Sequence, residues 1–124
     1  IGIEPRADRR TFAANNALAL GVPKLELVDG MVPAALHDLP APDAIFIGGG
    51  LSRETFDAAW AALRPLGRLV ANAVTLESEA ELIALHRDFG GDLVKLMVHR
   101  AEPVGRLTGW RPGMPVTQLS LVKR

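Results

Sequence analysis

The acidic residue Glu4 directly follows the short apolar run Ile1–Ile3. An apolar run that ends in this way is typical of a buried strand, and ligands of open α/β sheets bind outside the carboxyl ends of the strands. A carboxylate at such a position commonly accepts hydrogen bonds from the two ribose hydroxyls of a nucleotide or nucleoside. Glu4 is therefore a candidate ribose-binding residue. The alternatives are an ordinary surface acid or a partner of a helix dipole.

Two turns that follow apolar segments could bring backbone groups close to a ligand. The turn from Asp29 to Val32 could present N–H and C=O groups to a flat base. The triplet Gly48–Gly50 lies before a helix that Ser52 can cap, so close approach and free N–H donors would suit a carboxylate or a phosphate. Each turn could equally be a plain connection, because the chain contains neither a GxGxxG nor a GxxxxGK[ST] pattern.

Further polar side chains follow the later strands. Asn72 and Thr75 end the strand after the triglycine turn, where they could line a pocket, although Thr75 could simply cap a helix. The segment 101–115 is expected to be a long loop, and such loops are often functional. Its arginines could bind carboxylates through two parallel hydrogen bonds or could be solvated surface charges, and Trp110 could cover a flat ring.

Composition excludes several classes of function. The chain has 14 basic and 14 acidic residues, so no basic excess favours nucleic acid or an anionic membrane. The absence of cysteine excludes disulfides, a thiolate nucleophile and a cysteine-based zinc site, and the three histidines lack the spacing of metal ligands. No apolar stretch approaches the roughly 20 residues of a membrane span. A cytoplasmic protein without a bound metal is expected.

The candidate residues require elements that place them at one edge of a sheet. Strands are expected at residues 1–3, 25–28, 44–47, 68–74, 93–99 and 116–122, with helical segments at 9–20, 33–39 and 75–89 between them. Asp8 is expected to cap the first helix. A further helix is expected after Ser52, because four residues fall on one helical face: Phe56, Ala59, Trp60 and Leu63.

This order of elements predicts the class of fold. Alternating strands and helices indicate an α/β fold with a mainly parallel sheet and helices on both faces. The last two strands have no helix between them, which predicts an antiparallel strand pair at one edge. A chain of 124 residues is expected to form a single domain, residues 1–124.

Taken in order, four segments resemble the class I S-adenosylmethionine (SAM) methyltransferase family, which has a Rossmann-like fold: Ile1–Glu4, Leu27–Gly30, Asp43–Gly50 and Leu63–Val70. Three segments are similar, more narrowly, to the C-terminal methyltransferase domain of the decarboxylating precorrin-6Y C5,15-methyltransferases: Ile47–Gly50, Asn72–Glu77 and Met114–Gln118. The resemblance covers essentially the whole chain.

The resemblance implies roles for individual residues. Glu4 would hold the SAM ribose, Gly30, Met31 and Val32 would flank the adenine, and Gly48 would lie near the methionine end of SAM. Relatives often carry an acid at the position of Met31 that meets the adenine amino group, so backbone groups must serve here. Substrate-binding roles are expected for five residues: Gly49, Arg53, Asn72, Arg106 and Arg111. No catalytic acid or base is assigned.

The resemblance also implies a reaction. SAM would donate methyl groups to a tetrapyrrole, precorrin-6Y or 6B, with decarboxylation of an acetate side chain, in cobalamin (vitamin B12) biosynthesis. The many carboxylates of this substrate give a reason for arginines near the pocket. A homo-oligomer is expected.

One departure from the family concerns the start of the chain. The first strand, first helix and glycine-rich SAM loop of the family precede the ribose acid and are absent here, so the 124-residue chain by itself is expected to lack activity. Three alternatives remain open: a SAM methyltransferase of another small molecule, a different nucleotide-binding enzyme such as a dehydrogenase, and a non-catalytic fragment that serves oligomerisation.

Overall fold

The computed structural model covers residues 1–124, and the chain folds as two compact units, Ile1–Ala41 and Pro42–Arg124. The first unit contains β1 (Gly2–Ile3), α1 (Ala7–Ala19), β2 (Leu27–Val28) and the 3₁₀ helix η1 (Ala34–Leu36). β1 and β2 pair in parallel, with Gly2 opposite Leu27 and Ile3 opposite Val28. Helix α1 is therefore the crossover between two parallel strands, as the alternating pattern predicts.

The start of α1 differs from the expected one. The helix begins at Ala7, and Arg6 occupies the N-cap position without a side-chain cap, so the expectation that Asp8 caps the helix is wrong. Asp8 lies in the first turn instead, where the exposed N–H groups and the helix dipole favour an acid. Its carboxylate accepts two hydrogen bonds from the Arg6 guanidinium, which lower the pKa of Asp8.

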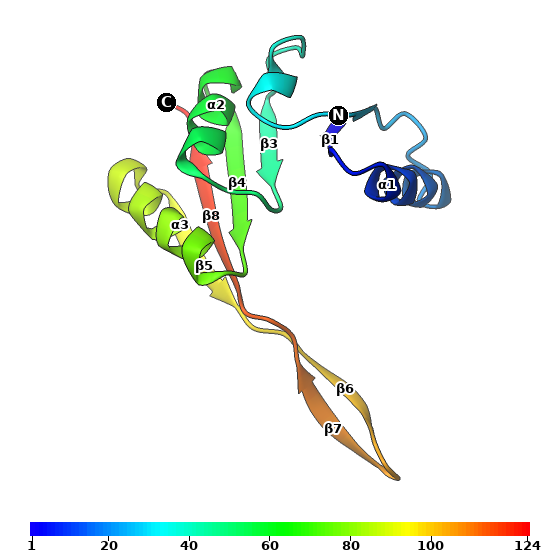
Figure 1. Cartoon of the computed structure of the whole chain (residues 1–124). Coiled ribbons are helices and arrows are strands. Elements are labelled where there is room, and N and C mark those ends of the chain that lie inside the picture. Colours follow the sequence, from blue (N-terminus) through cyan, green and yellow to red (C-terminus); the bar gives the residue numbers. More distant parts are fainter. The chain divides into compact units, whose positions relative to one another are not determined.

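The second unit is built on a four-stranded sheet with the order β3-β4-β8-β5 (Figure 1). Its strands are β3 (Ala44–Ile47), β4 (Arg68–Ala73), β5 (Asp92–Leu96) and β8 (Val116–Val122), and its helices are α2 (Arg53–Ala62) and α3 (Leu76–Phe89). β3 and β4 are parallel, whereas β8 is antiparallel to both β4 and β5. The predicted antiparallel pair is thus β5 and β8, at one edge of the sheet.

Both helices of this unit pack on the same face of the sheet. The core joins Phe56 and Ala59 of α2 and Leu82 and Leu85 of α3 to the buried strand positions, which alternate along β4 and β8. Ser52 and Thr75 accept hydrogen bonds from the backbone N–H groups of Thr55 and Ser78, so both expected N-caps are confirmed. The expected helical face is confirmed too, because Phe56, Ala59 and Leu63 are buried and Trp60 is partly buried.

The C-terminal end of α2 is closed by a side chain from a distant part of the chain. The Lys123 ammonium donates to the carbonyl oxygens of Trp60, Ala61 and Leu63 at 2.6, 3.2 and 2.6 Å. A cation at this place satisfies carbonyls that have no partner inside the helix and also complements the helix dipole. The segment after β8 therefore stabilises the packing of α2 against the sheet.

Residues 101–115 do not form the expected irregular loop. They belong mainly to a hairpin of β6 (His99–Val104) and β7 (Leu107–Pro112), which extends away from the sheet between β5 and β8 (Figure 1). The end of the predicted strand 93–99 is also wrong: β5 stops at Leu96, and His99 begins β6. The hairpin was not predicted because prolines usually indicate a loop. Pro103 lies in β6 without an N–H to donate, which only an edge strand tolerates.

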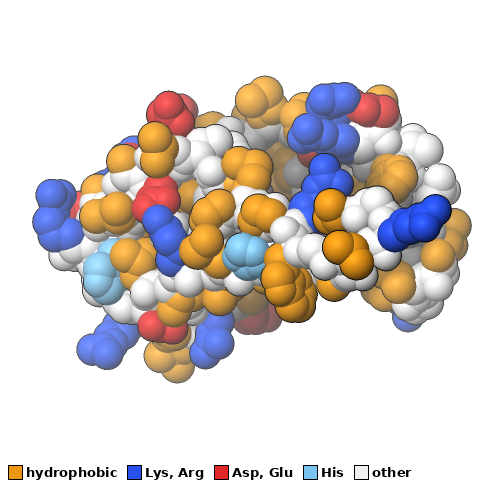
Figure 2. Space-filling model, turned by 90° about the horizontal axis from the view of Figure 1, so that it is seen from below, with side chains coloured by type: hydrophobic (Ala, Val, Ile, Leu, Met, Phe, Trp, Pro, Cys, Tyr) orange, Lys and Arg blue, Asp and Glu red, His pale blue; other side chains and the backbone are white.

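Large apolar side chains remain exposed on both units. Phe12 of the first unit is 70% exposed, and Leu107 and Trp110 of the second are 78% and 74% exposed. Figure 2 shows apolar side chains interspersed with lysines and arginines over the surface that it presents. None of the helices combines the length and the apolar character that a membrane crossing requires.

Candidate functional site

The carboxyl ends of β1 and β2 are joined by one arginine. Arg10 of α1 donates to the backbone oxygens of Glu4 and Pro5, each at 2.8 Å, and its guanidinium makes two hydrogen bonds of 3.0 Å to the Asp29 carboxylate. The Glu4 N–H also donates to the Val28 carbonyl. The structure therefore brings Glu4 and the turn 29–32 together at one sheet edge.

The Glu4 side chain is held beside the start of α1. Its Oε1 accepts from the Arg6 backbone N–H at 2.9 Å, and its Oε2 lies 3.7 Å from the Arg9 guanidinium. The side chain is 27% exposed, and the second oxygen has no hydrogen bond. This carboxylate can accept hydrogen bonds from a ligand with neighbouring hydroxyl groups.

The turn after β2 is closely packed at one position and open at the next. A Cβ on Gly30 would meet the Cβ of Ala35 at 3.0 Å, so this glycine allows η1 to pack against the turn. The Met31 side chain is 69% exposed, and Val32 is partly buried. Because Met31 has no charged atom, only the backbone here can offer polar groups to a base.

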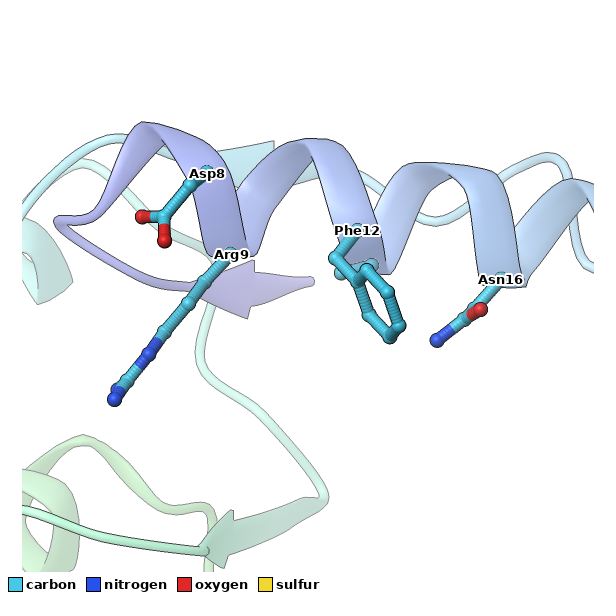
Figure 3. Close-up of a pocket in the computed structure, with 5 residues that line it drawn as sticks. Asp8, Arg9, Phe12 and Asn16 are labelled. Atoms are coloured by element: carbon cyan, nitrogen blue, oxygen red, sulfur yellow. The ribbon is translucent and has the colours of Figure 1, made fainter.

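A shallow hollow of about 410 Å³ lies along one side of α1. Figure 3 shows Asp8, Arg9, Phe12 and Asn16 directed to the same side of the helix. Arg9, at one end of this group, also lies near the Glu4 carboxylate. The hollow therefore borders the end of β1 in the first unit.

In the second unit, the triglycine turn and Asn72 lie side by side at one sheet edge. Gly48 directly follows Ile47, whose register partner Ala71 directly precedes Asn72. A Cβ on Gly49 or Gly50 would have no atom within 4 Å, so the backbone of this turn is open to a ligand. The hairpin of β6 and β7 extends from the same edge, because it connects the end of β5 to the start of β8.

Three predicted arginines have different surroundings. Arg53 donates to Asp57 and Asp88 and lies 5.8 Å from the centre of the Phe89 ring, so binding a substrate would require it to exchange these partners. Arg111 donates to Glu102 across the hairpin at 2.9 Å. Arg106 lies in the hairpin turn beside Gly105, whose φ is +62°.

Two residues that contact the predicted site residues at the carboxyl ends of the strands were not predicted from the sequence. Arg10 joins Glu4 to Asp29, and Gln118 of β8 donates from Nε2 to the Asn72 Oδ1 at 2.9 Å. Both bonds span long separations, 19 and 46 residues, so no local pattern indicates them. Glu4 with the turn 29–32 belongs to the first unit, whereas Gly48, Gly49, Arg53, Asn72, Arg106 and Arg111 belong to the second. The predicted roles of these residues stay predictions.

The class of fold is shown by comparison with solved structures. The structure of a SAM-dependent O-methyltransferase from Thermotoga maritima superposes with a TM-score of 0.68 at 17% sequence identity. The match covers 98% of this chain and 49% of the Thermotoga maritima chain. At this identity the likeness concerns the fold alone. The chain has the Rossmann-like α/β fold of the class I methyltransferases, as its order of elements and its resemblance predict.

Residues 1–123 match the precorrin methyltransferase domain family, and the chain belongs to that family. It is 51% identical to the precorrin-6Y C(5,15)-methyltransferase (decarboxylating) of Sinorhizobium sp over 99% of its length, and the match spans 30% of that relative. The solved C-terminal domain of precorrin-6Y C5,15-methyltransferase from Rhodobacter capsulatus is 48% identical, with a TM-score of 0.89, over 98% of this chain and 66% of that one. The chain therefore spans about a third of the length of the curated relative.

Proposed function

We propose that the full-length protein transfers methyl groups from SAM to a precorrin and decarboxylates an acetate side chain of this tetrapyrrole, in cobalamin biosynthesis. The observation that carries the proposal is the 51% identity, over 99% of the chain, to a relative named as a decarboxylating methyltransferase. The match spans only 30% of that relative. The whole reaction is therefore proposed for the full-length protein.

Each of the two units, taken by itself, offers residues that suit a part of SAM. Glu4 offers an acceptor for the ribose hydroxyls at the end of β1, and the backbone of Gly30, Met31 and Val32 offers polar groups to the adenine. In the second unit the methionine end is proposed to lie near Gly48, where a Cβ would lie 3.0 Å from the Phe46 ring, beside the open backbone of Gly49 and Gly50. SAM would supply an electrophilic methyl group, and the contribution of the protein is alignment of the acceptor carbon and exclusion of water.

The tetrapyrrole would lie over the edge of the second unit. Gly49 and Asn72 lie at this edge, and Arg106 and Arg111 lie on the hairpin that extends from it. Arginine suits such a substrate because its planar fork binds carboxylates. Arg53 would contribute only after releasing Asp57 or Asp88.

Residues 1–124 are proposed to form a single domain in the full-length protein. This is supported by the solved Rhodobacter capsulatus C-terminal domain, which is matched over 98% of the chain and hence over both compact units. A cytoplasmic location and a homo-oligomeric state stay predictions.

The reaction is tested with the purified full-length protein, SAM and a precorrin-6 substrate. Mass spectrometry should detect a product that has gained methyl groups and lost carbon dioxide, because the proposal requires both changes in one protein. Methylation without loss of carbon dioxide would limit the protein to methyl transfer. The absence of any SAM-dependent product would overturn the proposal and favour a non-catalytic domain.

Replacing Arg106 by alanine should raise the KM for the tetrapyrrole about 3- to 10-fold, because one charge-assisted hydrogen bond to a carboxylate is lost. The KM for SAM should not change. Steady-state kinetics of the full-length protein would measure both constants. Arg64→Ala is the matched control, since Arg64 is an exposed arginine that pairs with Asp43 at the opposite end of β3. Equal tetrapyrrole KM values for the two variants would contradict a substrate role for Arg106.

A further inference from the structure

A pair of amide side chains lies close to the carboxyl edge of the second-unit sheet. Asn72 of β4 and Gln118 of β8 are directly opposite each other in the antiparallel register. The Gln118 Nε2 donates to the Asn72 Oδ1 at 2.9 Å, and both side chains are partly buried. The pair lies next to the triglycine turn, because Gly48 continues the strand that pairs with β4.

The two amides lie on the face of the sheet that no helix of this unit covers. Side chains alternate along β4 and β8, so Ala71, Ala73 and Leu119 join the core beneath α2 and α3 while Asn72 and Gln118 lie on the opposite face. The amides thus do not contribute to the apolar core of the unit. Asn72 is the last residue but one of β4, so the pair lies within reach of a ligand at the carboxyl edge of the sheet.

The direction of the hydrogen bond determines what Asn72 can offer. Because the Asn72 carbonyl oxygen accepts from Gln118, the Asn72 NH₂ group remains as a donor pair. A free asparagine could turn either end of its amide toward a ligand. With its oxygen engaged by Gln118, the Asn72 amide directs its NH₂ group to a ligand, and such donors suit an acceptor such as a carboxylate.

We propose that Gln118 is a positioning residue, which holds the Asn72 amide so that its NH₂ group binds a carboxylate of a ligand. This role rests on the proposed function, in which Asn72 is a substrate-binding residue. Two ligands of that reaction carry carboxylates, the tetrapyrrole and the methionine end of SAM. Gln118 acts on either only through Asn72.

The test uses steady-state kinetics of the full-length protein with SAM and the precorrin-6 substrate. Gln118→Met keeps the length of the side chain but removes the hydrogen bond, so it should raise one KM about 3- to 10-fold, with kcat changed less than about 2-fold. An increase in the tetrapyrrole KM would show that the Asn72 amide binds a carboxylate of the tetrapyrrole. An increase in the SAM KM would show that it binds the methionine carboxylate of SAM. Ser120→Ala, on the same strand and face, is the control and should change neither constant.

A double-mutant cycle with Asn72→Ala separates positioning from a general structural effect. In the Asn72→Ala background, Gln118→Met should produce no further increase in KM, because there is no amide left to position. A second variant, Gln118→Glu, can only accept a hydrogen bond and should turn the Asn72 oxygen outward. It should therefore raise the same KM more than Gln118→Met does, and part of this increase should disappear in the Asn72→Ala background.

The outcomes distinguish this role from the proposed function. An active wild-type protein whose KM values are unchanged by both Gln118 variants would overturn the role and leave the function standing. Additive effects of Asn72→Ala and Gln118→Met would overturn it too. A wild-type protein that forms no methylated product would overturn both. Thermal unfolding followed by circular dichroism checks that each variant is folded.

Discussion

Replacing Glu4 by glutamine in the full-length protein is expected to weaken SAM binding about 10- to 100-fold. The carboxylate stands at the end of β1, where one oxygen is held by the Arg6 N–H and the other has no hydrogen bond. Glutamine keeps the size of the side chain but removes the charge and one acceptor oxygen, so the hydrogen bonds to the two ribose hydroxyls become weaker or are lost. The nearby Arg9 lies 3.7 Å away and is largely exposed, so the loss of this ion pair should contribute little.

Isothermal titration calorimetry with SAM measures this effect directly. Glu26→Gln is the matched control, because Glu26 is an exposed glutamate at the opposite, amino-terminal end of β2. That variant should bind SAM as the wild-type protein does. Equal dissociation constants for Glu4→Gln and Glu26→Gln would exclude Glu4 from the cofactor site and remove the main contact proposed in the first unit.

Gly91→Ala is expected to destabilise the domain by about 4 kcal/mol. Gly91 has a φ of +86°, in a region where an L-residue costs roughly 1–3 kcal/mol. A Cβ here would also lie 2.4 Å from the Leu121 Cδ2 and 2.5 Å from the Ser120 carbonyl oxygen. Because the carbonyl belongs to the backbone of β8, it cannot move aside without disturbing the sheet, and such overpacking costs roughly another 1–3 kcal/mol.

Gly90→Ala isolates the conformational part of this cost. Gly90 also has a positive φ, +72°, but no atom lies within 4 Å of the position of its Cβ. Its replacement should therefore cost only about 2 kcal/mol. Urea unfolding of the two variants, followed by circular dichroism, gives both free energies. A Gly91→Ala variant no less stable than Gly90→Ala would show that β8 does not approach the α3–β5 turn as closely as the structure indicates.

Local patterns were sufficient for much of the fold. The helical face of α2 and the caps Ser52 and Thr75 were predicted correctly, because a helix is stabilised by residues three or four positions apart. The wrong assignment of Asp8 as a cap shows the limit of such reasoning, since an acid is favourable both at the cap and in the first turn. The resemblance to precorrin methyltransferases was carried by short segments at strand ends and is confirmed by the family match.

The hairpin of β6 and β7 could not be predicted in the same way. Its sequence contains Pro103, Gly109 and Pro112, which individually favour a loop. The pairing of the two strands overrides these preferences, because each residue gains a partner across the hairpin while the prolines lie on strands with free edges. As a result, Arg106 lies in the hairpin turn and Arg111 in β7, whereas the sequence predicted an irregular loop for both.

By itself, the sequence determined which residue types end the strands, where the helices lie and to which family the chain belongs. Each of these depends on neighbours within a few positions or on short motifs that can be read along the chain. The tertiary structure alone decided the partners of those residues: Arg10 with Asp29, Gln118 with Asn72, and Lys123 with the end of α2. These contacts join residues 19 to 63 positions apart, and they form only after strand pairing and helix packing have brought the segments together.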